Sequence, residues 1–233
     1  TGVQTCALPI LKPNRLEAAK DVAAEFINGR PNDNIGITLF AGETFTQCPL
    51  TVDHAVLLDM IHNIKCGLIT DGTAVGMGIA NAVTRLKDSK AKSKVIILLT
   101  DGTNNKGDIS PMTAAEIAKS FGIRVYTIGV GTNGMAPYPY PVGNTVQYVS
   151  IPVEIDEKTL TEIAGTTDGN YFRATSNSKL KEVYEEIDKL EKTKLNVKEY
   201  SKRDEEYHWF ALAAFLCVLL EVLLRNSVLK KIP

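Results

Sequence analysis

Several common functional signatures are missing from this chain of 233 residues. Its four cysteines form no C-x-x-C pair and no zinc-ligand spacing, and its three histidines form no H-E-x-x-H motif. The net charge of −1 offers no basic surface, so nucleic acid is not an expected partner. A dinucleotide-binding G-x-G-x-x-G loop is missing as well. The cysteines are therefore expected to be free thiols, with a bridge between Cys48 and Cys66 as the open alternative.

One apolar run, residues 95–99, organises the rest of the chain and leads into Thr100, Asp101 and Gly102. An apolar run without alternation is typical of a strand that is buried on both faces of a parallel sheet. Asp101 then lies at the carboxyl end of this strand, where open α/β sheets bind their ligands. A carboxylate followed by glycine makes this position a candidate metal or phosphate site, with simple capping of a turn as the alternative.

Apolar periodicity predicts helices and strands on both sides of this run. Helices are expected over residues 14–28, 54–64, 74–86, 113–122, 157–164 and 180–190. Further strands are expected over residues 35–40, 124–130 and 171–173, with a mixed stretch at 41–53 and a loop or hairpin at 137–152. This order implies an α/β fold with a doubly wound, mostly parallel sheet and right-handed connections.

Local signals predict where two helices start and how a third one packs. Asn14 with Glu17 fits a capping box, and Thr113 opens a second one. Gly76 and Gly78 are poor helix formers, so we expect them where their helix packs closely on the sheet.

The end of the chain has a different composition. Residues 193–206 are predicted to be a charged linker, residues 207–229 a transmembrane helix and residues 230–233 a short tail. A rise of about 1.5 Å per residue gives the predicted span roughly 34 Å, enough to cross a bilayer. Glu221 is unfavourable there, although it can pair with Arg225 one turn later. A core or docking helix is the alternative.

Thr73 and Asp101 are expected on neighbouring loops at the carboxyl edge of the sheet. Their hydroxyl and carboxylate oxygens suit a hard cation such as Mg²⁺ or Mn²⁺. Two protein ligands leave coordination positions open, which suits the capture of a partner's carboxylate. Tyr138 and Tyr140 emerge at the same edge and are candidate partner contacts, with packing on their own domain as the alternative.

The motif Asp-Gly-Thr at residues 71–73, before a helix, and Thr-Asp-Gly at residues 100–102, after a strand, resemble the von Willebrand factor type A (VWA) domain. The resemblance covers residues 11–192. It implies a metal-ion-dependent adhesion site, or MIDAS, in which Thr73 and Asp101 bind Mg²⁺ or Mn²⁺.

The same resemblance implies that Gly72 and Gly102 belong to the partner-binding surface. In the family, an Asp-x-Ser-x-Ser motif ends the first strand and completes the metal site. Residues 1–10 stand at that place and carry neither an acidic residue nor a serine. We therefore expect a foreign N-terminal segment, a missing first strand and an incomplete metal site.

Residues 11–20, 117–134 and 225–230 resemble the Bat proteins, the membrane-anchored VWA proteins of Bacteroides-type aerotolerance operons. This resemblance implies a binding or assembly role beside other Bat-type VWA proteins and a MoxR-type AAA+ ATPase, without catalysis. It also implies a place at the cytoplasmic (inner) membrane, with the VWA domain in the periplasm. The alternatives are a phosphoryl-transfer enzyme of the receiver or haloacid-dehalogenase type that uses Asp101, and a structural domain with an empty metal site.

Overall fold

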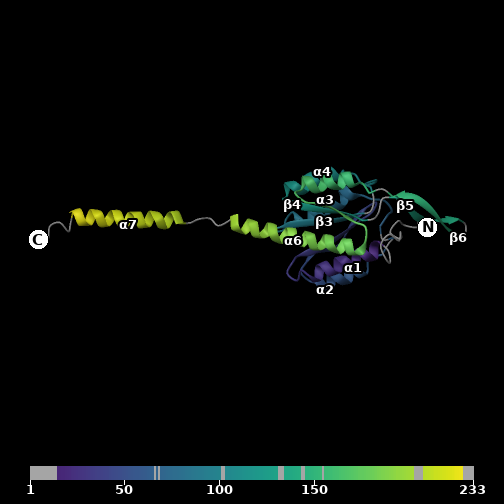
Figure 1. Cartoon of the computed structure of the whole chain (residues 1–233), viewed down its shortest axis with the longest axis horizontal. Helices are drawn as coiled ribbons and strands as arrows, with labels where there is room; N and C mark the ends of the chain where they lie inside the picture. The colour runs from purple at the N-terminus through teal and green to yellow at the C-terminus, as the bar shows by residue number, and fades with distance from the viewer. Residues whose placement is uncertain are drawn as a thin grey trace. The chain divides into compact units, whose positions relative to one another are not determined.

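The computed structural model describes residues 15–65, 67, 69–100, 103–130, 134–142, 145–153, 155–201 and 207–227. Two compact units divide the chain, Thr1–Glu191 and Lys192–Pro233. The elements of the first unit are shown in Figure 1 and are α1 (Arg15–Asn28), β1 (Ile35–Phe40), β2 (Thr44–Thr51), α2 (His54–His62), α3 (Val75–Leu86), β3 (Lys94–Thr100), α4 (Pro111–Ser120), β4 (Ile123–Val130), β5 (Gly134–Val142), β6 (Thr145–Val153), α5 (Glu157–Thr166) and β7 (Tyr171–Ala174). Helix α6 (Asn177–Ser201) runs from the first unit into the second, which also holds α7 (Tyr207–Ser227).

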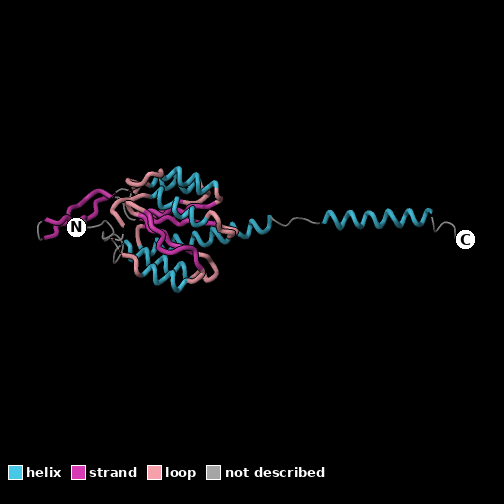
Figure 2. Tube along the Cα trace, turned by 180° about the vertical axis from the view of Figure 1, so that it is seen from behind, coloured by secondary structure: helices cyan, strands magenta, loops and turns pink. Residues whose placement is uncertain are grey.

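The described strands form three separate ladders. Strands β3, β4 and β7 make a parallel sheet in the order β3-β4-β7, while β1 pairs with β2 and β5 pairs with β6 in antiparallel fashion. Figure 2 shows the strands of the parallel sheet among the helices of the first unit, with the β5–β6 pair extending away from them. The parallel sheet confirms the predicted α/β fold, and β5 with β6 confirms the hairpin expected at residues 137–152. Strand β2 covers most of the stretch that the sequence predicted as mixed, with a short strand and a turn, and its pairing with β1 shifts register near Ile37.

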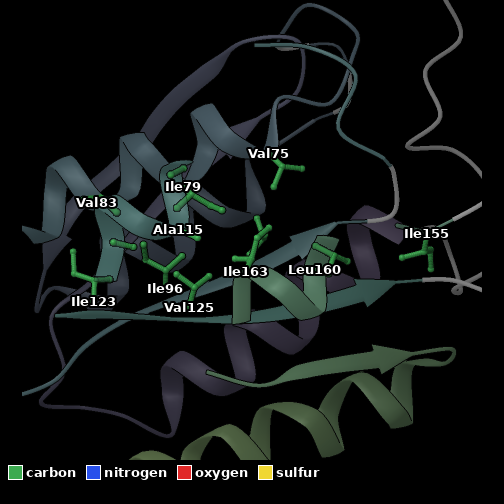
Figure 3. Close-up of a cluster of buried hydrophobic side chains, with 13 residues drawn as sticks. Val75, Ile79, Val83, Ile96, Ala115, Ile123, Val125, Ile155, Leu160 and Ile163 are labelled. Carbon is green, nitrogen blue, oxygen red and sulfur yellow. The ribbon is translucent and has the colours of Figure 1, made fainter. Parts of the chain in front are cut away.

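One face of the parallel sheet is covered by α3, α4 and α5. Their apolar side chains meet those of β3 and β4 in a single buried cluster, as Figure 3 shows. The members of the cluster are Val75, Ile79, Val83, Ile96, Leu98, Ala114, Ala115, Ala118, Ile123, Val125, Ile155, Leu160 and Ile163. Burial of this many branched side chains on one face explains why β3 and β4 are nearly all apolar.

Helices α1 and α6 cover the opposite face. Ala18 and Val22 of α1 pack with Tyr126 and Ile128 of β4, in a cluster that also takes Leu180 from α6. Because helices cover both faces, the predicted doubly wound arrangement is confirmed for the described strands.

A third cluster joins α1, α2 and the β1–β2 pair. Ile27, Leu57 and Ile61 pack there around Cys48, a buried free thiol. The prediction of a free thiol is therefore confirmed at Cys48, while Cys66 lies outside the described residues.

The predicted capping box at Thr113 is wrong. The N-cap of helix α4 is Ser110, three residues before Thr113. Its side chain accepts a hydrogen bond from the Thr113 backbone N–H at 3.1 Å. Pro111 occupies the first helical position, where its missing N–H costs nothing and its fixed φ suits the helix. At α1, Asn14 lies outside the described residues, so its predicted capping role is not described.

Residues 193–201, which the sequence predicted as part of a charged linker, are helical, because α6 continues to Ser201. Leucine, lysine and glutamate are strong helix formers, which favours a helix in this charged stretch. Residues 202–206 lie outside the described part of the chain.

Helix α7 forms over most of the predicted span, residues 207–229. In the part of the chain that the structure describes, none of the helices combines the length and the apolar character that a membrane crossing requires. The predicted transmembrane helix is therefore not supported by the described residues. Glu221, whose charge opposes burial in lipid, lies inside the apolar run of α7.

Candidate functional site

Three loops meet at the N-terminus of α3, and we call residues 41–43, 70–74 and 104–107 the loop junction. The loop that follows β1 is tied to the start of α3 by two backbone hydrogen bonds. The N–H of Gly42 donates to the carbonyl of Thr70 at 2.8 Å, and the N–H of Ala74 donates to the carbonyl of Ala41 at 2.7 Å. The carboxyl end of β1 therefore lies beside the first turn of α3.

The loop that follows β3 caps the same helix. The Asn105 side-chain carbonyl accepts from the Thr73 N–H at 2.9 Å, and the Asn104 side-chain carbonyl accepts from the Val75 N–H at 2.8 Å. The Asn105 N–H donates back to the Thr73 carbonyl at 3.0 Å. Ala74, at the N-cap, has no side chain that could do this. Asn104 and Asn105 therefore fix the loop after Asp101 against Thr73.

Sequence reasoning missed these two asparagines. The available signal was a helix start at Ala74 without a capping side chain of its own. A helix that lacks its own cap needs acceptors from elsewhere for its first N–H groups. Only the folded chain shows that they come from a loop about 30 residues away, a separation that loop-closure entropy tolerates.

Glycines allow close contacts in and beside the loop junction. Gly72 has φ of +135°, and a Cβ at this position would lie 2.6 Å from Cγ of Lys106. A Cβ at Gly76 would lie 2.0 Å from the carbonyl oxygen of Ile109. The close packing predicted for Gly76 is therefore confirmed, although it is made against a loop rather than the sheet. Gly78 packs on the ring of Phe40 in β1, which confirms its predicted role.

The structure describes some of the predicted site residues in full, others only by their backbone, and others not at all. Thr73 is half-buried in the loop junction, and no hydrogen bond to its hydroxyl comes from the described residues. Asp101 and Gly102 lie outside those residues. Tyr138 and Tyr140 lie on β5, opposite Val149 and Gln147 of β6, and their side chains are not described.

A metal site fits the described residues only in part. No group of three or more His, Cys, Asp or Glu side chains in the described ranges is placed to hold a metal ion. The Asp71 carboxylate in the loop junction already accepts from the Gly72 N–H at 2.9 Å. The Thr73 hydroxyl alone cannot hold a divalent cation, which needs about six oxygen ligands. The first turn of α3 adds the positive end of a helix dipole, which favours an anionic group beside it.

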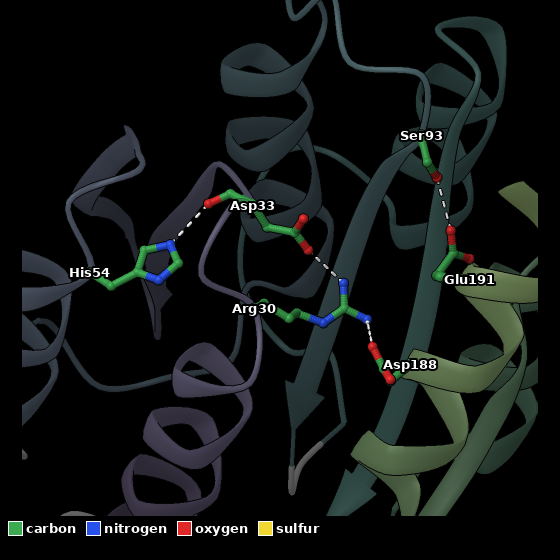
Figure 4. Close-up of polar contacts among 6 residues, drawn as sticks. All are labelled: Arg30, Asp33, His54, Ser93, Asp188 and Glu191. Carbon is green, nitrogen blue, oxygen red and sulfur yellow. Dashed lines mark hydrogen bonds and ion pairs between the residues drawn. The ribbon is translucent and has the colours of Figure 1, made fainter.

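A second polar cluster lies away from the loop junction, where Glu191, near the middle of α6, meets the sheet (Figure 4). Glu191 is only 5% exposed and accepts from the Tyr126 hydroxyl at 2.5 Å and the Ser93 hydroxyl at 2.8 Å. Arg124 forms an ion pair with the same carboxylate. Burial raises the pKa of Glu191, but the three hydrogen bonds and the Arg124 charge outweigh it, so the pKa lies below its ordinary value.

Arg30 makes a comparable connection between α1 and α6 (Figure 4). Its guanidinium pairs with Asp33 at 2.7 Å and with Asp188 of α6 at 2.5 Å, and it lies 4.4 Å from the ring centroid of Phe26. The Glu191 cluster joins α6 to the sheet and the Arg30 cluster joins α1 to α6. Neither cluster is at the carboxyl edge where ligands are expected.

The fold is an α/β module in which the loops after β1 and β3 meet at the N-terminus of α3. The family model for the von Willebrand factor type A domain matches residues 12–186, and the chain belongs to this family. The resemblance drawn from the motifs at residues 71–73 and 100–102 is therefore confirmed.

Relatives by sequence are longer than this chain. An uncharacterized protein of Borreliella burgdorferi is 27% identical over 227 residues, which cover 97% of this chain and 67% of that protein. A UPF0353 protein of Nocardia farcinica is 31% identical over 194 residues, which cover 76% of this chain and 56% of that protein. The chain thus spans between about half and two thirds of the length of these relatives.

Solved structures give a similar result. BatB from Bacteroides thetaiotaomicron has a TM-score of 0.70 at 33% identity, covering 81% of this chain and 94% of that one. An aerotolerance-related membrane protein from Bacteroides fragilis, with multiple mutations to serine, has a TM-score of 0.68 at 32% identity, covering 80% and 94%. Proximal thread matrix protein 1 from the mussel byssus, with a zinc-occupied MIDAS motif, has a TM-score of 0.57 at 25% identity, covering 75% and 40%. The expected likeness to Bat proteins is confirmed, without a distinction between BatA, which the sequence motifs suggested, and BatB.

Proposed function

We propose that this chain is a non-catalytic VWA module that binds a partner protein at the loop junction. In this proposal, Thr73 and Asp101 supply two oxygen ligands to a divalent cation, and a carboxylate of the partner supplies another. Gly72 and Gly102 leave room for that partner close to the backbone. The observation that carries the proposal is the double asparagine cap, because it holds the loop after Asp101 beside Thr73.

Two further observations support this function. The mussel relative has a MIDAS motif occupied by zinc, which supports divalent-cation binding in domains of this fold. The positive end of α3 lies at the loop junction and favours the approach of a partner's carboxylate. Tyr138 and Tyr140 on the β5–β6 hairpin are proposed as additional contacts, since tyrosine is common at interaction hot spots.

Paramagnetic Mn²⁺ tests the site directly, because it broadens NMR signals near the place where it binds even when binding is weak. Added to the ¹⁵N-labelled full chain, Mn²⁺ is expected to broaden the amide signals of Thr73 and Asn105 first. The variant Asp101→Asn should lose this selectivity. Asp108→Asn is the matched control, because Asp108 is an exposed carboxylate on the same loop, and it should behave like the wild type.

Broadening that is centred elsewhere, or that is equal in the two variants, contradicts the proposed site. Calorimetry with Mg²⁺ adds a second measurement. Because Thr73 and Asp101 leave most coordination positions to water, we expect weak Mg²⁺ binding or none in this chain, and tight binding would contradict the expectation of an incomplete site.

The proposed partners are other Bat-type VWA proteins and a MoxR-type AAA+ ATPase, and the proposed location is the cytoplasmic (inner) membrane with the VWA domain in the periplasm. The B. fragilis neighbour, which is named a membrane protein, supports the association with a membrane. Protease added to intact spheroplasts should cleave a periplasmic domain. Complete protection of the domain would contradict this location.

A phosphoryl-transfer function of Asp101 is the competing proposal. Such enzymes place further carboxylates beside the acceptor to bind Mg²⁺, and the described residues hold no such cluster. Incubation with acetyl phosphate should therefore leave the mass of the chain unchanged. A stable mass increase of one phosphoryl group that disappears in Asp101→Asn would favour the enzyme instead.

A further inference from the structure

A short basic segment lies at the edge of the parallel sheet opposite the loop junction. Residues 85–94 run from the end of α3 to the start of β3. Their charged side chains are Arg85, Lys87, Asp88, Lys90, Lys92 and Lys94. Five basic side chains and one acidic one give this segment a net charge of +4, inside a chain whose net charge is −1. The charge of the whole chain therefore conceals a local concentration of positive charge.

The end of α4 adds to the same edge. Strands β3 and β4 are parallel and in register, with Lys94 opposite Ile123, so the turn before β4 lies beside the segment that precedes β3. This turn contains Phe121, which is 45% exposed, and the last turn of α4 contributes the exposed Lys119. We call residues 85–94 and 119–121 the basic edge.

Contacts inside the fold do not account for all of these lysines. Lys87 and Lys90 are exposed, and their side chains form no ion pair or hydrogen bond with the described residues. Lys87 is the C-cap of α3, where a positive charge offsets the negative end of the helix dipole. This effect is confined to the last turn, so it does not explain Lys90 or Lys92. By contrast, Lys94 donates to the Lys87 carbonyl at 2.8 Å and holds the segment in place.

The chain leaves the first unit at the same edge. Glu191 is the last residue of this unit, and its carboxylate accepts from the hydroxyl of Ser93 in the basic edge at 2.8 Å (Figure 4). It also pairs with Arg124 near the start of β4. The second unit follows directly and holds α7, on which Leu212 and Phe215 are more than half exposed. A membrane that binds the second unit is therefore connected to the first unit at the basic edge.

We propose that the basic edge docks on an anionic membrane surface, an inference that rests on the membrane location proposed above and assigns the face of the first unit that meets the lipid. Lys87, Lys90 and Lys92 would bind phosphate oxygens of the headgroups. Phe121 would enter the interfacial layer, where aromatic side chains are favoured beside basic ones. The loop junction, at the opposite edge, then stays open to its partner.

A membrane suits this edge better than a polyanion in solution. A nucleic acid or an acidic protein would have to be captured by a few lysines alone. A membrane that holds the second unit is instead kept near the edge by the chain itself, which raises its effective concentration. Each lysine close to an anionic surface strengthens the association about fivefold, so three lysines should contribute about a hundredfold.

Lysine acetylation, measured by mass spectrometry, tests this docking on the full chain. The chain is labelled with vesicles of phosphatidylcholine alone or with vesicles that also contain phosphatidylglycerol. On the anionic vesicles, labelling of Lys87, Lys90 and Lys119 should slow about fivefold or more relative to Lys106, which is exposed at the loop junction. Neutral vesicles should leave the ratio unchanged, and about 1 M salt should remove the effect by screening.

A matched pair of variants separates position from charge. The triple variant Lys87→Gln, Lys90→Gln and Lys92→Gln removes three positive charges from the basic edge and leaves Lys119 to report on docking. Its control carries the same change at three exposed lysines elsewhere in the first unit, Lys65, Lys158 and Lys179. Protection of Lys119 on anionic vesicles should be lost in the first variant and kept in the control.

The other results overturn the proposal. Equal slowing on neutral and anionic vesicles would mean that apolar contacts, rather than the lysines, bring the first unit to the lipid. Slowing at Lys106 instead of Lys119 would place the opposite edge on the membrane. Equal protection by inorganic phosphate or by a DNA duplex would assign the edge to a soluble phosphate ligand.

Sedimentation with the vesicles separates this inference from the proposed location. A chain that sediments with both kinds of vesicle, without slower labelling of the basic edge, would overturn the docking and leave the membrane location intact. A chain that sediments with neither kind would contradict both proposals.

Discussion

Replacing Glu191 by glutamine tests whether the polar cluster that α6 makes with the sheet stabilises the first unit. The variant keeps the shape of the side chain and removes its charge from Arg124, whose own side chain is 16% exposed. Leaving one partner of a largely buried ion pair without the other costs several kcal/mol, reduced here because glutamine still accepts a hydrogen bond. We expect a loss of about 3 kcal/mol in the free energy of unfolding at neutral pH.

For a domain of this size, that loss should lower the melting temperature by roughly 6–12 °C. Glu182→Gln on the same helix is the matched control, because Glu182 and its partner Lys179 are each 58% exposed. Exposed pairs contribute little, so this control should change the stability by less than about 0.5 kcal/mol. The measurement is circular dichroism at 222 nm during heating of the full chain.

The pH dependence supplies a second criterion. The Glu191 carboxyl has a pKa below its ordinary value of 4.5, so between these two values the unfolded chain binds more protons than the folded one. The stabilisation is complete above pH 4.5 and is lost as the pH falls through the folded pKa. The difference between wild type and Glu191→Gln should therefore shrink only in acid. Equal melting of Glu191→Gln and Glu182→Gln at neutral pH would refute the reasoning.

The remaining predictions concern the loop junction and its helix. Gly76→Ala should destabilise the chain by about 2 kcal/mol in urea, because its Cβ would lie 2.0 Å from the Ile109 carbonyl oxygen. Gly165→Ala, with no atom within 4 Å of its Cβ, should instead be neutral or up to about 1 kcal/mol more stable, and the opposite order would contradict the packing argument. Asn104→Ala should cost about 1 kcal/mol and speed hydrogen exchange at the Val75 amide, whereas Asn104→Asp, which keeps an acceptor, should not.

The sequence was most informative where the controlling interactions are local. The run at residues 95–99 predicts β3 because branched side chains favour strands and an unbroken apolar pattern requires burial on both faces. The helices at residues 15–28 and 75–86 follow from apolar periodicity in the same way. The cap of α4 shows the limit of such signals, since Ser110 with Pro111 and Thr113 with Glu116 both fit a helix start, and proline decides between them.

The description of the candidate site depended on both the sequence and the tertiary structure. Thr73 was singled out by its motif, and its roles with Asp101 in metal binding stay predictions. The asparagine cap that joins their two loops could not be predicted from the sequence. Water can satisfy the first N–H groups of α3 equally well until folding brings in the acceptor, which lies about 30 residues away.

By itself, the sequence determined the strand and helix order, the VWA resemblance and the position of the candidate edge. Only the tertiary structure decided that Glu191 meets Arg124 and Tyr126, and that Gly76 packs on a loop. The physical reason is that helix and strand preferences arise from neighbours in the sequence, whereas these contacts join segments whose proximity is set only when the whole core packs.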